Sequence, residues 1–81
     1  MKVKVLLFAH IREIVGKDAL SMEFDGKPTG NDLLEKLVQL HPEVENLITH
    51  LKLAMNGSYM ESGDTIQENA EIAVFPPVSG G

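Results

Sequence analysis

The sequence contains one long helical pattern, and strand-like segments lie on both sides of it. Residues 33–40 repeat leucine and valine at the spacing of an amphipathic helix. Thr29 followed by Asp32 resembles a capping box, which starts a helix, and Pro42 ends the segment. A single apolar helix stripe in a short chain must be buried against a sheet built from the remaining segments.

The remaining segments are short and mostly strand-like. Residues 2–9 begin with alternation and become apolar on both faces, which is typical of a central strand. Asn56-Gly57 is the residue pair of a tight hairpin turn. Short helical turns are predicted over residues 10–15, before Gly16, and over residues 42–50. The predicted strands cover residues 2–9, 19–24, 51–55, 58–60 and 71–75.

This order of elements predicts an α+β fold in which one main helix packs on one face of a mixed sheet. That arrangement is the β-grasp, or ubiquitin-like, layout. Pro76 and Pro77 stop the last strand, because proline lacks the N–H that a sheet ladder needs. We therefore expect residues 1–75 to form the β-grasp domain and residues 76–81 to form a flexible, extended carboxyl-terminal tail.

Charge and composition exclude several function classes. The chain has 81 residues, a net charge of −5 and seven scattered Lys and Arg residues, which argues against binding to a nucleic-acid backbone. It has no cysteine, so it forms no disulfide and no thiolate metal site. The longest apolar run is too short to span a bilayer and no signal-peptide pattern is present, so we expect a cytoplasmic protein.

The last residues, Val78-Ser79-Gly80-Gly81, predict a chemical handle. Glycine has no Cβ, so Gly80 and Gly81 can thread a narrow channel, and the segment from Pro76 reaches on the order of 20 Å. The terminal carboxylate is an anion and a poor electrophile near neutral pH, so an acyl-adenylate made with ATP would be needed to activate it. A frayed terminus or an expression remnant is the alternative interpretation.

The strand alternation also predicts an apolar surface on the sheet face away from the helix. If Val3, Val5 and Leu7 face the helix, the residues between them face outward. The resulting outer face resembles a partner-binding surface, although a register slip of one residue would bury both phenylalanines instead. Its predicted apolar members are Leu6, Phe8, Ala54, Ala73 and Phe75.

Other residue patterns indicate no independent chemistry. His10, His41 and His50 match no zinc-binding spacing, so we expect no metal. The sequence has no G-x-S-x-G elbow and no glycine-rich phosphate loop, so we expect no cofactor and no autonomous enzyme. Lys52 is interpreted either as a cation at an interface or as a solvated side chain. Most acidic residues are interpreted as solvated charge, and some of them as contacts to a basic partner groove.

Three groups of residues match a known pattern: Phe8-Ala9 followed by Arg12-Glu13 and Gly16, then Asn56, and then the ending from Phe75 to Gly81. On these residues the chain resembles the small subunit of molybdopterin synthase over its full length. The resemblance implies a β-grasp fold whose terminal Gly81 is adenylated by an E1-like activating enzyme that uses ATP, and is then converted to a thiocarboxylate by a sulfur donor. The large synthase subunit would receive this end and build the dithiolene of molybdopterin, in a heterotetramer of two small and two large subunits.

The resemblance also implies roles for individual residues. Gly80 would thread the large subunit's channel, and the partner contacts would come from Phe8, Arg12, Lys52, Tyr59, Phe75, Pro76, Pro77, Val78 and Ser79. The chain departs from the family pattern at Glu68-Asn69-Ala70-Glu71, where an acidic-glycine-acidic turn is usual, and at Tyr59, where an aliphatic residue is common.

Three other functions fit the same features. A sulfur carrier for another pathway, such as thiazole formation, and a ubiquitin-like tag joined to target lysines would both use an activated Gly81. A non-covalent adaptor would use only the outer face of the sheet. A residue added after Gly81 distinguishes the adaptor from the rest, because an adaptor tolerates that extension.

Overall fold

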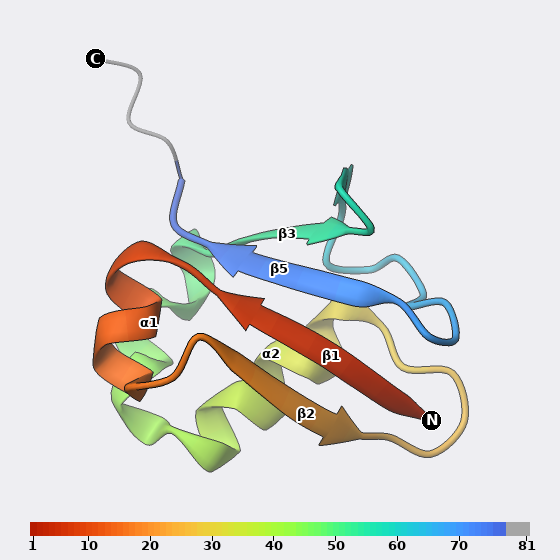
Figure 1. Cartoon of the computed structure of the whole chain (residues 1–81), viewed down its shortest axis with the longest axis horizontal. Coiled ribbons are helices and arrows are strands. Elements are labelled where there is room, and N and C mark those ends of the chain that lie inside the picture. Colours follow the sequence, from red (N-terminus) through yellow and green to blue (C-terminus); the bar gives the residue numbers. More distant parts are fainter. Residues whose placement is uncertain (78–81) are drawn as a thin grey trace.

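The predicted amphipathic segment is the main helix of the protein, and it lies behind a five-stranded sheet (Figure 1). The computed structural model describes residues 1–77. Its elements in chain order are β1 (Lys2–Leu7), α1 (Ala9–Val15), β2 (Ala19–Glu23), α2 (Gly30–Leu40), the 3₁₀ helix η1 (Pro42–His50), β3 (Lys52–Met55), β4 (Ser58–Met60) and β5 (Glu71–Phe75).

The strands follow the order β2-β1-β5-β3-β4 across the sheet. β1 and β5 run parallel in its centre, and the other neighbouring pairs are antiparallel. The sheet is therefore mixed, as predicted, and both chain ends lead into adjacent strands. The first strand ends earlier than its apolar pattern predicts, because Ala9 already begins α1 and takes a positive φ of 52°.

Local signals in the sequence account for the boundaries of α2 and of the β3–β4 hairpin. The Thr29 side chain accepts the Asp32 backbone N–H at 3.3 Å, and the Asp32 carboxylate accepts the Thr29 N–H at 2.8 Å, so the capping box is confirmed. Asn56 and Gly57 have φ of 51° and 86°, the left-handed pair that a type I′ hairpin turn requires. Asn69 likewise has a φ of 61°, a left-handed conformation that asparagine adopts more readily than most residues.

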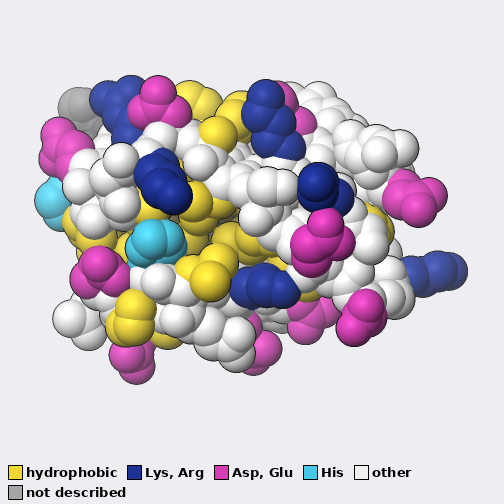
Figure 2. Space-filling view, turned by 60° about the horizontal axis from the view of Figure 1, so that its bottom comes forward, with side chains coloured by type: hydrophobic (Ala, Val, Ile, Leu, Met, Phe, Trp, Pro, Cys, Tyr) yellow, Lys and Arg dark blue, Asp and Glu magenta, His cyan; other side chains and the backbone are white. Residues whose placement is uncertain are grey.

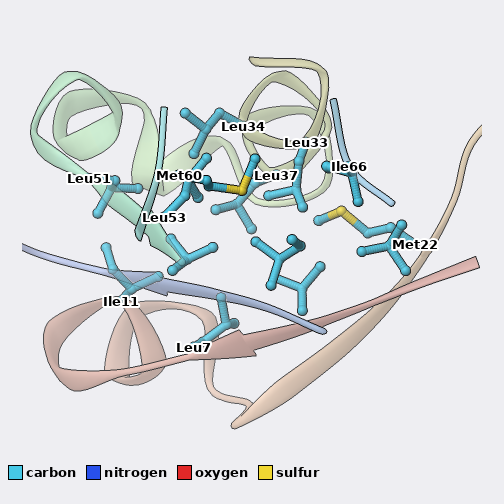
Figure 3. Packing of buried hydrophobic residues seen from close by; sticks show 14 of the residues in the cluster. Leu7, Ile11, Met22, Leu33, Leu34, Leu37, Leu51, Leu53, Met60 and Ile66 are labelled. Carbon is cyan, nitrogen blue, oxygen red and sulfur yellow. The ribbon is translucent and has the colours of Figure 1, made fainter. Parts of the chain in front are cut away.

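The core lies between the sheet and α2 (Figure 3). Val3, Val5 and Leu7 of β1 are buried, as are Ile72 and Val74 of β5. They meet Leu33 and Leu37 of the helix, together with Leu53 and Met60 from the hairpin. The predicted register is therefore confirmed, and the alternative one-residue slip that would bury both outer phenylalanines is excluded.

One buried segment has no clear pattern in the sequence. Ile66 and Ala70 are each 2% exposed, although they lie in a stretch of otherwise polar residues. The Ile66 N–H donates to the carbonyl of Pro28 at 2.8 Å, which holds this connection against the start of α2. Isolated apolar residues carry no periodicity, so sequence pattern alone does not assign them to the core.

The close approach of α2 to the hairpin predicts the effect of a single methyl group. A Cβ at Gly30 would lie 2.7 Å from the Leu53 Cδ1 and 3.0 Å from the Ser62 carbonyl oxygen. We expect Gly30→Ala to lower the free energy of unfolding by about 1–3 kcal/mol, because this overpacking outweighs the better helix propensity of alanine. Gly63→Ala is the control, since nothing lies within 4 Å of its added Cβ. Urea denaturation of both variants checks the prediction, and equal stability would contradict it.

Candidate partner-binding face

The outer face of the sheet, opposite α2, carries a continuous apolar row. Strand pairing places Leu6 beside Ala73, Ala73 beside Ala54, and Ala54 beside Tyr59. These four residues therefore form one line across β1, β5, β3 and β4. The two alanines in the middle are half-buried, and their side chains are smaller than those of Leu6 and Tyr59 at the two ends of the line.

A second line follows where β1 and β5 end. Phe75 pairs with Lys52, and the Phe8 N–H donates to the carbonyl of Val74 at 3.3 Å, which extends the parallel ladder by one residue. Phe8 is also the N-cap of α1, with extended backbone angles, so its side chain stays on the outer face as the chain turns away. We call Phe8, Tyr59 and Phe75, with Leu6, Ala54 and Ala73, the aromatic patch.

The aromatic side chains of the patch are accessible to a partner. Tyr59 is 68% exposed and Phe8 is 44% exposed, whereas Phe75 is half-buried. The Tyr59 and Phe75 rings lie 6.4 Å apart between centroids with an interplanar angle of 30°. This distance is within the range of favourable aromatic pairs, so the two rings support each other. Exposed large apolar side chains that gather in one place are typical of an interaction surface.

Charged side chains surround the patch. Lys4 lies 3.7 Å from Glu71, and Lys2 lies 4.0 Å from Glu23, in exposed pairs along the outer face. Such pairs contribute little to stability because water screens them, so they remain available to a partner. Lys52 is exposed next to Phe75, which fits either of its two predicted roles.

Arg12 stands apart from the patch. Its backbone N–H donates to the Phe8 carbonyl at 3.4 Å, which places it one helical turn along α1. Its Nε lies 4.0 Å from an Asp18 carboxylate oxygen, so the side chain extends toward the loop before β2. The structure thus brings Phe8, Tyr59, Phe75 and Lys52 together, and it leaves Arg12 on the border of this surface.

The carboxyl-terminal segment leaves the sheet beside the aromatic patch. Pro76 is half-buried and Pro77 is exposed directly after β5, and Figure 1 shows the chain departing at the end of the sheet where α1 begins. Because β1 and β5 are parallel, this exit lies next to Phe8. The predicted roles of Val78, Ser79, Gly80 and Gly81 fall on residues outside the described part of the chain.

Two further features bear on the kind of site. Within residues 1–77, no three histidine or acidic side chains gather as a metal site would require. None of the helices in that range is both long and apolar enough to cross a bilayer.

The pairing of β1 with β5 could not be predicted from the strand patterns, because it joins segments from opposite ends of the chain. The contact of Tyr59 with Phe75 depends on the pairing of β3 with both β4 and β5.

These features define a ubiquitin-like β-grasp protein with an apolar outer face next to its carboxyl-terminal segment. The model of the ThiS family matches residues 5–81, so the chain belongs to the ThiS family. A molybdopterin synthase sulfur carrier subunit from Dictyostelium discoideum is 36% identical, over 96% of this chain and 94% of the relative. The predicted resemblance is thereby confirmed.

The chain is also similar to an archaeal protein in both sequence and structure. Small archaeal modifier protein 1 from Haloferax volcanii is 35% identical, over 93% of this chain and 95% of the relative. The crystal structure of SAMP1 from Haloferax volcanii superimposes with a TM-score of 0.85 at 30% identity, and the match covers 100% of both chains. The predicted β-grasp fold is thereby confirmed by a solved structure.

The geometry of the patch predicts an energetic coupling between its two paired rings. We expect Tyr59→Ala and Phe75→Ala to be less destabilising in combination than the sum of the single changes, by about 0.5 kcal/mol, because the first change already removes the ring contact. A double-mutant cycle measured by urea denaturation tests this. Combining Tyr59→Ala with Leu40→Ala is the control pair, because exposed Leu40 lies on α2. Strict additivity for the aromatic pair would contradict the contact.

Proposed function

We propose that this chain is the sulfur carrier subunit of a molybdopterin synthase. The observation that carries the proposal is the aromatic patch at the exit of the carboxyl-terminal segment, in a chain whose relatives of similar length bear that name. A carrier must dock its folded body and release its end into another protein's active site. An exposed apolar surface beside the last strand supports that requirement.

The chemistry would take place on the carboxylate of Gly81. An oxygen of this carboxylate attacks the α-phosphorus of ATP on an E1-like enzyme, and pyrophosphate leaves. The terminal sulfur of a persulfide on a donor protein then attacks the acyl carbon, so that a C–S bond forms and the bond to AMP breaks. A thiol then reduces the S–S bond that still joins the chain to the donor, so that the donor leaves with its own thiol and the thiol reductant is oxidised to a disulfide. The resulting thiocarboxylate keeps its negative charge on a polarizable sulfur, which attacks the carbon of the pterin precursor better than a carboxylate oxygen does.

The proposal divides the chain into a docking body and a delivery segment. Residues 1–75 would dock through Phe8, Tyr59 and Phe75, with Arg12 and Lys52 at the rim. Residues 76–81 would extend into the large subunit, where Pro76 and Pro77 set the direction, Val78 and Ser79 line the entrance and Gly80 passes the narrowest point. The chain itself binds no cofactor and is not the catalyst. Two copies would join two large subunits in a heterotetramer.

The large subunit would supply the positive charge for an anionic substrate. Residues 41–81 hold six carboxylate side chains and one lysine, so this half of the chain has no basic cluster for a phosphate. The same acidic surface suits a basic groove on the activating enzyme. We therefore assign the pterin-binding pocket to the partner.

The first prediction from this function concerns the mass of the chain. Incubation with ATP, its activating enzyme and a sulfur donor should add about 16 Da to the carboxyl-terminal peptide, because sulfur replaces one oxygen. Intact and peptide mass spectrometry measure the change. A variant with one alanine added after Gly81 should show no gain, whereas Gly63→Ala should gain the same mass as the wild type. A gain elsewhere in the chain, or in the extended variant, would refute the carrier mechanism.

The second prediction concerns docking to the large subunit. Phe75→Ala should weaken binding by about 1–4 kcal/mol, because a half-buried aromatic ring at the centre of an interface is a typical anchor. Isothermal titration against the large subunit measures the change. Leu40→Ala is the matched control, since it removes a 52% exposed apolar side chain on α2 and should leave the affinity unchanged. An unchanged titration for Phe75→Ala would remove this residue from the interface.

A protein modifier is the second candidate function. It is favoured by the 35% identity to small archaeal modifier protein 1, and it requires the same activated Gly81. A modifier would join its end to lysine amines of other proteins, so that conjugates of higher mass accumulate in cells and vanish when Gly81 is deleted. A carrier of sulfur for thiazole formation would instead show the mass gain without binding to a molybdopterin synthase large subunit.

A further inference from the structure

The two edges of the sheet differ in length. β4 spans three residues, which is too short to offer much of a ladder to another strand. β2 spans five residues, contains no proline, and lies at the other end of the strand order. Within residues 1–77 no segment pairs with its outer side. An open edge of this length is a template for an added strand.

The hydrogen bonds around β2 show which of its residues face outward. The Leu7 N–H donates to the Asp18 carbonyl at 2.8 Å, and the Phe24 N–H donates to the Met1 carbonyl at 2.8 Å. In an antiparallel ladder, every second residue directs its N–H and C=O toward the neighbouring strand. Asp18 and Phe24 bond toward β1, so the odd-numbered residues between them direct these groups away from β1. The outward residues are Ala19, Ser21 and Glu23.

One outward group already has a partner within the chain. The Lys36 ammonium donates to the Glu23 carbonyl oxygen, which agrees with the outward direction of that group. A carbonyl oxygen accepts two hydrogen bonds, so this contact does not block the strand from pairing.

We propose that β2 pairs antiparallel with β2 of a second copy of this chain, about a two-fold axis at Ser21. In this register Ser21 faces its own copy, and Ala19 faces Glu23 of the other copy, so that all three outward residues are matched. An axis at Glu23 would oppose two carboxylates, and an axis at Leu20 or Met22 would match fewer outward residues. The two five-stranded sheets would then form one continuous sheet.

The side chains of β2 complement each other in the same register. Leu20, which is half-buried, would lie opposite Met22 of the second copy on the helix side. Lys17 and Asp25 flank the strand and would come to facing ends of the pairing, where their charges are opposite. Figure 2 brings this side of the molecule forward and shows hydrophobic side chains partly exposed among charged ones.

The distribution of charge favours this edge for contact between two acidic chains. Residues 1–40 carry six basic and six acidic side chains, whereas residues 41–81 carry one basic and six acidic side chains. The whole net charge of −5 therefore belongs to the second half, whose acidic side chains lie on η1, on the connection between β4 and β5, and at the start of β5, and none of them lies on β2. Two copies that meet at β2 keep their excess negative charge apart.

The proposed pairing leaves both aromatic patches free. Because the second copy runs antiparallel, its carboxyl-terminal segment would leave the joined sheet at the opposite end. Each copy could then carry its own sulfur and dock its own partner. The contact is one pair of short strands, so we expect a weak dimer that forms at high protein concentration.

Sedimentation equilibrium of the full chain, from micromolar to about 1 mM, tests the proposal. We expect a concentration-dependent dimer, and Ser21→Pro should raise its dissociation constant about tenfold or more, because proline removes an outward N–H that the monomer does not use. Ser21→Ala keeps that N–H and is the matched control, with dimerisation retained. A wild type that stays monomeric throughout, or a Ser21→Pro variant that dimerises equally well, would overturn the proposal.

A charge exchange keeps the test valid if Ser21→Pro disturbs the fold, which circular dichroism would show. Lys17→Asp and Asp25→Lys should each weaken the dimer about two- to fivefold, since each places like charges at both ends of the pairing. The combined variant restores opposite charges and should recover the affinity of the wild type. If the two substitutions instead weaken the dimer additively when they are combined, this register is excluded.

Discussion

The parallel pairing of β1 with β5 is the contact on which the rest of the structure depends. It joins the first strand to the last in the centre of the sheet, so every other element is arranged around it. Val5 and Leu7 lie beside Ile72 and Val74 in this ladder, and all four side chains are buried. The same pairing brings Phe8 to the point where the chain leaves β5. The register of the β1–β5 pairing therefore determines both which side chains form the core and which form the proposed docking surface.

Two polar contacts support that register from the side of the hairpin. The Asn56 side-chain oxygen accepts the Glu71 N–H at 2.9 Å, and the Asn56 N–H donates to the Glu71 carbonyl at 2.9 Å. The turn between β3 and β4 is thus attached to the first residue of β5. A single asparagine forms the left-handed turn and also fixes where β5 begins, which in turn sets the position of Phe75 four residues later.

Local chemistry in the sequence predicted the helices, strands and turns, whereas the contacts between distant elements became known only from the structure. The capping box at Thr29, the Asn56-Gly57 turn and the alternation in β1 and β5 each act within a few residues, and each is confirmed. The burial of Ile66 and the pairing of Tyr59 with Phe75 depend on contacts between distant segments, for which a single sequence carries no periodic signal. The outer patch was predictable because alternation fixes the face of a residue, although not its lateral partner.

The surfaces of the sheet differ in polarity and charge. The outer face near the end of β5 is apolar and aromatic, and the excess of negative charge lies on η1, on the connection between β4 and β5, and at the start of β5. The β2 side is electrically balanced and has outward backbone groups at Ala19 and Ser21. A chain of this size buries only about 60% of the surface of its unfolded form, so it cannot hide every apolar side chain. In the proposed docking, burial of the exposed aromatic residues against the partner would remove apolar surface from water and so contribute affinity.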